Sequence, residues 1–308
     1  ITGPMSMGLP VLSVDGLFNL ERCLDIAKKY NVTNLAGAPT VFRMLIAAGA
    51  KVADQWKGQL RVVSSAGEPL NPEVIRWFKE HLDAPINDHY GQTEMGMVLC
   101  NHHNLAHPIH IGAAGYASPG HRVVVLNEET LEELPAGQPG ILSVDVERSP
   151  MFWFKGYKGI ETKSFKGRYY LTGDTAELNS DGSISFVGRS DDVISTSGYR
   201  VGPFDVESAL LEHPAVIEAA VVGKPDQQRN EIIKAFVILQ DGFEGTLELA
   251  EELRLHVRNR LAAHAYPREI EFAQELPKTP SGKVQRFILR INEMNKYNEQ
   301  QQAKQAVS

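Results

Sequence analysis

Residues 61–90, RVVSSAGEPLNPEVIRWFKEHLDAPINDHY, contain two β-prone runs with a helical pattern between them. The runs are Arg61–Ser65 and Pro85–Tyr90. Between them, Asn71 supplies an N-cap and Pro72 a first-turn proline for a helix that carries two large aromatic residues. Strands that alternate with helices in this way predict parallel βαβ units. This stretch therefore predicts an α/β layer.

The residues before this stretch continue the same alternation. Apolar residues recur at helical spacing over residues 20–30, and Asn31–Gly37 has the pattern of a short strand. Pro39 is suited to the first turn of a helix through Thr40–Ala48. We expect residues 1–111 to form part of an α/β subdomain.

Residues 112–190 have a different secondary-structure pattern, with short β-prone runs separated by turns that contain Gly, Pro, Asn and Asp. The runs are Arg122–Leu126, Ile141–Val146, Arg168–Leu171 and Ser183–Val187. This pattern predicts a small antiparallel sheet or β barrel, forming a β-rich subdomain of the larger domain.

Residues 191–291 predict a compact α+β domain. Its expected elements are a helix Pro203–His213, strands Ala215–Val222 and Ile232–Leu239, a helix Leu247–Ala263 and a strand Glu269–Ala273. The segment 292–308 is rich in Gln, Asn and Lys, and we expect a polar tail that is a frayed helix or disordered.

Composition narrows the class of protein. The 308 residues fit about two domains, and 31 Lys and Arg against 38 Asp and Glu give a net charge of −7. That balance argues against a general binder of nucleic acid or anionic membranes. The chain contains no apolar run near the ~20 residues of a membrane span. With only Cys23 and Cys100, a disulfide framework is excluded and a reducing, cytoplasmic setting is expected.

Five segments carry residues suited to chemistry. They are Ser65–Pro69, Asp88–Glu94, Tyr170–Asp174, Gly188–Arg200 and Pro277–Lys283. In this order they closely resemble the adenylate-forming superfamily of acyl-CoA synthetases, adenylation domains and luciferase-like enzymes, from about Asn31 to Arg290. The resemblance implies α/β plus α+β architecture, with a partial large domain and a mobile C-terminal domain.

The first two segments are implied to hold the adenine of ATP or AMP. In the resemblance, Gly67-Glu68-Pro69 and Asp88-His89-Tyr90 sandwich the base. A glycine lets the backbone approach a base closely, and Tyr90 offers an aromatic face. Without the other motifs, Gly67–Pro69 would equally be a turn between a strand and a helix.

Thr93 is implied to meet the α-phosphate and Glu94 to hold Mg²⁺, which prefers carboxylate oxygens. The alternative is a helix N-terminus with Thr93 as its cap. Asp174 is implied to accept both ribose hydroxyls, with Arg189 adding a donor. Its alternative is an ordinary Gly-Asp β-turn.

The remaining implied residues concern domain movement and catalysis. Asp191 matches the family's hinge, Gly198 the glycine of the pantetheine tunnel, and Arg200 a residue that contacts phosphate or fixes the CoA-forming conformation. Lys283, in Thr-Pro-Ser-Gly-Lys, matches the catalytic lysine that would stabilise the acyl carboxylate and α-phosphate. Alone, a Gly-Lys pair would be read as a turn.

The acyl pocket is partly represented. Acetate-specific members carry tryptophan where Gly91 stands, so Gly91 favours a medium-chain or aryl acid, and Ala38 would line the other side. Segments 198–203 and 265–268 look most like medium-chain acyl-CoA synthetases. The nearby stretch 102–110 contains four histidines, His102, His103, His107 and His110. Their spacing matches no standard zinc site, so we expect this stretch to be a polar loop.

The family's upstream phosphate loop has no match before Asn31. We therefore expect the whole protein to have a further N-terminal part. We expect the present chain alone to be inactive in adenylation. The resemblance implies an acid–thiol ligase that uses ATP, Mg²⁺, a carboxylic acid and CoA, with no nucleic acid and no stable membrane insertion. Two alternatives stay open, a ligase that loads a carrier protein and a non-catalytic nucleotide-binding relative. The sequence leaves the oligomeric state undetermined.

Overall fold

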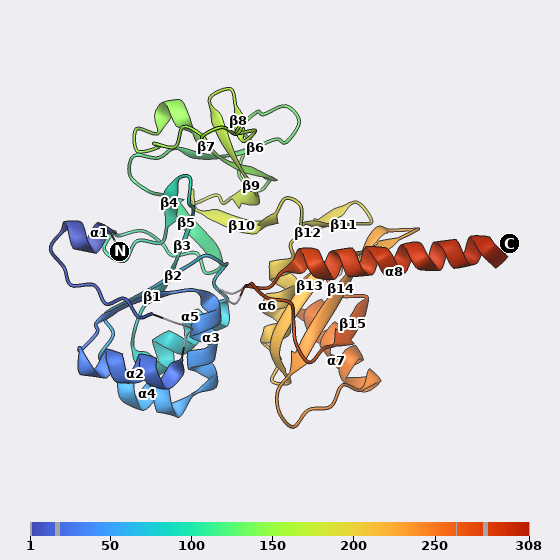
Figure 1. Ribbon diagram of the computed structural model, residues 1–308, viewed down its shortest axis with the longest axis horizontal. Helices are drawn as coiled ribbons and strands as arrows, with labels where there is room; N and C mark the ends of the chain where they lie inside the picture. The colour runs from blue at the N-terminus through green and yellow to red at the C-terminus, as the bar shows by residue number, and fades with distance from the viewer. Residues whose placement is uncertain (1, 16–18, 263, 280–282, 308) are drawn as a thin grey trace.

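The computed structural model describes residues 2–15, 19–262, 264–279 and 283–307, and it contains two β-sheets with helices around them (Figure 1). The strands of the larger sheet are β1 (Asn34–Gly37), β2 (Val62–Ala66), β3 (Ile86–Gln92), β4 (Gly96–Cys100), β5 (Ala113–Ala117), β6 (Val123–Leu126), β7 (Pro139–Asp145), β8 (Phe165–Lys166), β9 (Tyr169–Leu178) and β10 (Ile184–Arg189). The helices beside it are α1 (Thr2–Ser6), α2 (Leu20–Lys29), α3 (Pro39–Ala47), α4 (Ala50–Trp56) and α5 (Pro72–Trp77).

Strands β1, β2 and β3 are parallel neighbours, which confirms the predicted βαβ units. Helices α2 to α5 bury a core led by Phe42, Trp56 and Phe78. The helix after Asn71 is α-helical only to Trp77 and continues as a π-type turn to Leu82. This core fixes the carboxyl ends of β2 and β3, where α/β sheets bind ligands.

The β-rich region continues the same sheet. Its pairing order is β5-β10-β9-β7-β6, all antiparallel, with β8 beside β9. The sequence predicts an antiparallel sheet or barrel here, and the described strands form the sheet, because β6 pairs with β7 alone and the order stays open. The reason is that β5 is already paired with β4, so these strands extend the sheet rather than closing on themselves.

The second sheet has the order β12-β11-β14-β13, with β15 parallel to β14. Its elements are β11 (Ile194–Thr196), β12 (Tyr199–Val201), α6 (Pro203–Leu211), β13 (Val216–Asp226), β14 (Asn230–Leu239), α7 (Leu247–Arg260), β15 (Glu269–Phe272) and α8 (Arg286–Val307). Apolar residues of α6, α7 and the strands form one core. Helix α7 ends at Arg260, and Ala263, its expected end, lies outside the described residues.

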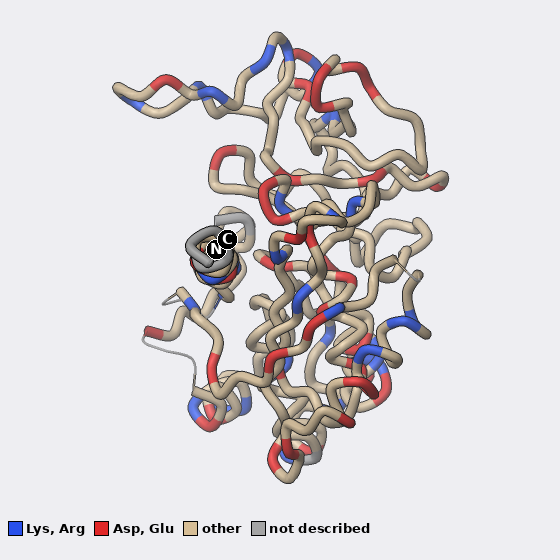
Figure 2. The backbone as a smooth tube through the Cα atoms, turned by 90° about the vertical axis from the view of Figure 1, so that its right-hand side faces the viewer, with Lys and Arg blue, Asp and Glu red and all other residues tan. Residues whose placement is uncertain are grey.

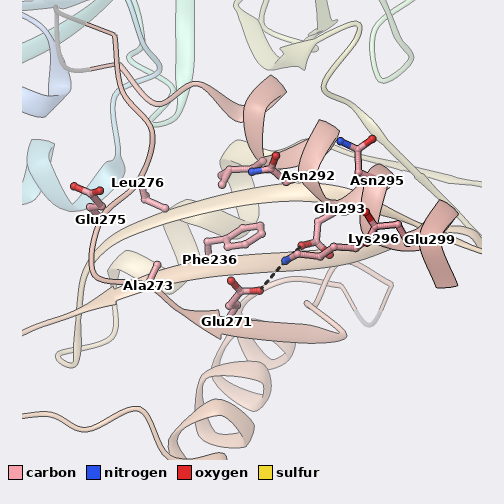
Figure 3. Close-up of a pocket in the computed structure, with 11 residues that line it drawn as sticks. Phe236, Glu271, Ala273, Glu275, Leu276, Asn292, Glu293, Asn295, Lys296 and Glu299 are labelled. Carbon is pink, nitrogen blue, oxygen red and sulfur yellow. Dashed lines mark hydrogen bonds and ion pairs between the residues drawn. The ribbon is translucent and has the colours of Figure 1, made fainter.

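Helix α8 runs without a break through residue 292, where the sequence predicts the start of a polar tail, and it projects from the second sheet (Figure 1). Buried charges hold its first half. Lys234 Nζ lies 2.9 Å from Glu293 Oε1 and 2.7 Å from Glu271 Oε2, and Lys296 Nζ lies 2.7 Å from Glu293 Oε1. Figure 3 shows Glu271, Glu293 and Lys296 of this group beside Phe236, among the residues that line a cavity of about 360 Å³. These contacts between α8 and the sheet explain why a polar sequence is helical here.

The chain crosses from one sheet to the other over residues 190–193. Helix α8 contacts this crossing, because Arg290 Nη1 donates to the carbonyl oxygen of Asp191 and lies 2.6 Å from Asp192 Oδ1. Figure 2 shows basic and acidic residues interspersed along the described trace. Within the described part of the chain, no helix combines the length and apolar character that a membrane crossing requires.

Candidate functional site

A cavity of about 570 Å³ lies where the two sheets meet. The larger sheet contributes residues at the ends of β2 and β3, together with Asp174 and Arg189. The second sheet and its loops contribute Glu207, Lys283 and Arg286. Residues far apart in the sequence thus form one cleft, and each of the five motif segments contributes at least one residue to it.

The Lys283 side chain enters this cleft from the segment just before α8. Its Nζ donates a hydrogen bond of 3.0 Å to the carbonyl oxygen of Gly67. Gly67 has φ +97°, and a Cβ there would lie 3.3 Å from the lysine Nζ. Glycine therefore serves both the backbone conformation and the close approach of the ammonium group. Residues 280–282 of the lysine motif lie outside the described residues.

Asp174 is the centre of a buried polar group. The Tyr90 hydroxyl donates to Asp174 Oδ2 at 2.5 Å, and Gln92 Nε2 donates to the same oxygen at 2.9 Å. Arg189 Nε lies 3.7 Å from the other oxygen. Burial raises the pKa of the Asp174 carboxyl, and the contacts from Tyr90 and Arg189 act in the opposite direction. Such a carboxylate is oriented to accept hydrogen bonds from a ligand's hydroxyl groups.

Sequence reasoning missed Gln92. It follows Tyr90 by two residues on β3, so both side chains face the same side of the strand. This two-residue spacing from Tyr90 is the sequence signal that could have identified Gln92 as a site residue. Tyr90 itself has a raised pKa, first because it is buried and then because Asp174 is negatively charged. The phenol therefore stays protonated and remains a donor.

Asp88 and His89 form the buried floor of the cleft. The Leu70 amide donates to Asp88 Oδ2 at 3.1 Å, and burial raises the Asp88 pKa from its ordinary 3.8 to about 7. Burial, with His103 and His102 nearby, lowers the His89 pKa to about 4. Within the described residues, Asp88 Oδ1 and His89 Nδ1 are buried without a hydrogen-bond partner. Both atoms are therefore available to a ligand or to water.

The raised pKa of Asp88 predicts a pH-dependent stability. Between about pH 4 and pH 7 the unfolded chain releases this proton while the folded protein keeps it, so folding stability falls as pH rises. We expect Asp88→Asn, which has no such proton, to gain Tm relative to wild type across this window, with a constant difference above about pH 7.

The control for this experiment is Asp181→Asn, because hydrogen bonds from Ser183 lower the pKa of Asp181. The wild-type carboxylate is then stabilising above its ordinary pKa of 3.8, so this variant is expected to lose Tm relative to wild type as pH rises towards about 4 and to keep a constant difference between about pH 4 and pH 7. Parallel trends in the two variants would contradict the assignment to Asp88.

Thr93 and Glu94 lie in the turn between β3 and β4, beyond the residues that line the cleft. The Tyr157 hydroxyl donates to Glu94 Oε1. Among the described residues no group of three or more His, Cys, Asp or Glu could hold a metal ion. A single carboxylate still fits Mg²⁺ that arrives with phosphates, because this cation keeps waters and takes only one or two protein carboxylates.

Gly198 and Arg200 lie in the β11–β12 hairpin, also outside the cleft. Ser197 and Gly198 have φ of +50° and +83°, as a tight two-residue hairpin turn requires. Arg200 Nη1 lies 3.6 Å from Glu128 Oε2 of the β-rich region. In this arrangement the loop with Lys283, rather than the hairpin, faces the cleft.

Gly91 and Ala38 were expected to line an acyl pocket. Gly91 does border the cleft, but a Cβ there would overlap the carbonyl oxygen of Gly96 and lie 2.9 Å from Met97 Cα. A side chain here would require β4 to move, so the close approach of β4 explains the glycine, and the missing side chain does not by itself indicate space for a longer acid. Ala38 caps α3 and does not line the cleft; Thr40 of that helix donates to Glu68 Oε2 at 3.2 Å.

The four histidines after β4 contact one another and their neighbours. The His102 amide donates to His107 Nε2 at 3.0 Å, and the ring of His107 packs edge-on against Tyr116. His103 packs edge-on against His89. The loop therefore backs the floor of the cleft.

Two family models match the chain. The AMP-binding enzyme model matches residues 1–157, and the AMP-binding enzyme C-terminal domain model matches residues 205–283. The first match includes the cleft residues at the ends of β2 and β3, and the second ends at Lys283.

The chain is similar to acetyl-coenzyme A synthetase of Bacillus subtilis, at 43% identity over 96% of this chain and 52% of that protein. A crystal structure of Brucella canis acyl-CoA synthetase is 63% identical, with a TM-score of 0.63 over 96% of this chain and 54% of that one. MatB from Rhodopseudomonas palustris is 27% identical to the chain. Its ATP-bound structure matches with a TM-score of 0.76 over 89% of this chain and 53% of that one. Its apo structure matches with a TM-score of 0.66 over 88% of this chain and 53% of that one.

The chain spans about half the length of the curated relatives it matches. Both family models, the ordered motifs and the cleft that joins them agree, and we conclude that the chain belongs to the AMP-binding enzyme family.

Proposed function

We propose that this chain carries the nucleotide-binding edge and the mobile C-terminal domain of an ATP-dependent acyl-CoA synthetase. The observation that carries the proposal is the contact of Lys283 Nζ with the Gly67 carbonyl, in the same cleft as Asp174. A cation at this point faces the position where a carboxylate and a phosphate would meet. The acid is proposed only as a carboxylic acid, because the close approach of β4 is a sufficient reason for Gly91, and the likeness of segments 198–203 and 265–268 to medium-chain synthetases does not define an acyl pocket.

In the first half-reaction, a carboxylate oxygen attacks the α-phosphorus of ATP. An O–P bond forms, the α–β phosphoanhydride bond breaks, and pyrophosphate leaves with the electron pair. Residues 67–69 and 88–90 would hold adenine, and Asp174 with Arg189 would hold the ribose. Thr93 would contact the α-phosphate, and Lys283 would stabilise the negative charge that builds up on the phosphate and the acid.

Glu94 would hold Mg²⁺, which when bound neutralises phosphate charge. The position of Glu94 supports this role, because its side chain is only partly buried beside Tyr157 and a cation that enters with ATP can reach it. The turn between β3 and β4 would then contact the phosphates, while β3 itself contacts the base.

In the second half-reaction, the thiolate of CoA attacks the acyl carbonyl carbon and AMP leaves. We propose that the small domain, residues 191–291, turns about Asp191 between the two steps, withdrawing Lys283 and presenting Gly198 and Arg200. The better superposition on the ATP-bound than on the apo form of MatB supports assigning the present arrangement to the nucleotide-binding step.

The test is pyrophosphate release by the full-length gene product, with acids from acetate through medium-chain to aryl, with and without CoA. The proposal expects pyrophosphate with at least one acid and free acyl-CoA when CoA is added. Pyrophosphate without acyl-CoA, but with acyl transfer to a carrier protein, would instead support a carrier-loading ligase. AMP binding without pyrophosphate for any acid would indicate a non-catalytic relative.

A further inference from the structure

We propose that Arg286, paired with Glu207, is a positioning residue that sets the place of Lys283 in the cleft. This inference rests on the proposed function, because it concerns how the adenylating lysine is aimed. Arg286 begins α8 three residues after Lys283, and Glu207 lies on α6. Both side chains line the cleft beside Lys283.

The pair has two-point geometry. Arg286 Nε donates to Glu207 Oε1 at 2.8 Å and Arg286 Nη2 to Oε2 at 2.6 Å. Glu207 is 5% exposed, and its Oε1 also accepts the Val221 amide at 2.9 Å. A planar guanidinium held at two points has one orientation relative to its partner, unlike a lysine ammonium. Helix α6 and strand β13 thereby fix the start of α8.

The backbone transmits this orientation to Lys283. Between Arg286 and Lys283, the Gln285 amide donates to the Pro277 carbonyl at 2.8 Å. The Thr279 amide donates to the Lys283 carbonyl at 2.8 Å, and the Lys283 amide donates to Thr279 Oγ1 at 3.1 Å. Lys283 therefore stands on a narrow hairpin whose returning strand leads directly into Arg286.

The other end of this hairpin has a weaker anchor. Lys278 Nζ lies 2.7 Å from Glu218 Oε2, but the Lys278 side chain is 38% exposed and makes a single contact there. Exposed single-point ion pairs contribute little. Farther along α8, the ion pair of Lys234 and Glu293 holds the helix on the sheet. The two-point pair of Arg286 lies between these anchors and is nearest to the catalytic position.

Charge gives the pair a second effect on the lysine. Glu207 is a carboxylate in the same cleft as the Lys283 ammonium. Arg286 occupies both of its oxygens, so Glu207 is not left as a competing partner that draws Lys283 away from the substrate phosphate. Loss of the arginine would thus misplace the loop and offer Lys283 a wrong partner.

The experiment measures both half-reactions of the full-length protein for Arg286→Lys. A displacement of about 1 Å can cost on the order of 10²-fold in rate. We expect adenylation kcat to fall about 10- to 100-fold, while the KM for ATP and the rate of thioester formation from supplied acyl-adenylate stay within about twofold. Glu207→Gln should show the same pattern, and the double variant should be no slower than the slower single variant.

Arg122→Lys is the matched control. Arg122 also makes a two-point contact, at 2.7 and 2.6 Å with Glu133, but it lies in the β-rich region. The rates of both half-reactions in Arg122→Lys should match those of the wild-type protein. Unchanged adenylation in Arg286→Lys, equal loss of both half-reactions, or an equal loss of adenylation in Arg122→Lys would overturn the inference. A wild-type protein that adenylates no acid would instead reject the proposed function and this inference with it.

Discussion

Lys283→Ala is expected to lower acyl-adenylate formation by about 10²- to 10³-fold, the usual cost of removing one group that stabilises transition-state charge. Thioester formation from supplied acyl-adenylate should stay near the wild-type rate, because the lysine would leave the cleft before CoA reacts. The structural basis is the position of its Nζ at the Gly67 carbonyl, between walls contributed by both sheets. Pyrophosphate release and acyl-CoA formation, measured separately, give the two rates.

The control is Lys278→Ala, which removes a lysine from the same hairpin. Its Nζ pairs with Glu218 and its side chain is 38% exposed, so adenylation should change by less than about threefold. Equal loss of both half-reactions in Lys283→Ala would refute the assigned role. Equal effects of the two lysine variants would show that general charge, rather than position, matters.

Gly198→Leu is expected to have the opposite effect, slowing thioester formation by at least about tenfold while adenylation stays near wild type. In the present arrangement Gly198 lies on the β11–β12 hairpin, and a Cβ added there would meet nothing within 4 Å. A leucine there would not disturb the cleft while Lys283 occupies it. After the proposed rotation, the same side chain would stand in the path of the thiol, because effective attack requires reacting atoms about 3–3.5 Å apart.

Backbone strain must be separated from blockage of the thiol path. Gly198 has φ +83°, where a leucine costs roughly 1–2 kcal/mol. Gly182, in the β9–β10 turn, has φ +84° and also nothing within 4 Å, so Gly182→Leu carries the same strain at a distant hairpin. Both variants should lose similar Tm, and only Gly198→Leu should lose CoA-dependent turnover. Normal thioester formation in Gly198→Leu would eliminate the tunnel assignment.

Local signals predicted the elements well because local interactions form them. Asn71 and Pro72 marked the start of α5, and the predicted runs Arg61–Ser65 and Pro85–Tyr90 became the parallel strands β2 and β3. The shape of the β-rich region was not accessible in this way. Whether β6 closes a barrel depends on which strand edges are already paired, and β5 is taken by β4.

The sequence left the tail as a frayed helix or disordered for a related reason. Residues 292–308 have too little apolar surface to predict a stable helix alone, but Glu293 and Lys296 meet Lys234 and Glu271 on the neighbouring sheet. Those partners lie more than 20 residues away in sequence, so composition could not reveal them. Tertiary contacts decide the helix here.

In the candidate site, too, residues marked by local motifs could be predicted, and residues whose role depends on tertiary contacts could not. Motif residues such as Tyr90, Asp174 and Lys283 were recognisable from their order, and the fold brings them to one cleft. Arg286 and Glu207 were missed, because the importance of each depends on the other across 79 positions. The role of Gly91 stays a prediction, since a glycine can mark either space for a ligand or a close backbone approach, and the position of Gly96 shows the close approach.

The contact of β3 with β4 at Gly91 also bears on attempts to engineer substrate choice. A larger side chain at this position would meet the Gly96 carbonyl, so it is accommodated only where β4 moves away from β3. A screen scored by activity would then report the displacement of β4 together with any change in the acyl pocket. Efforts to change which acid is accepted should therefore vary side chains that already point into open space and leave this crossing of two strands untouched.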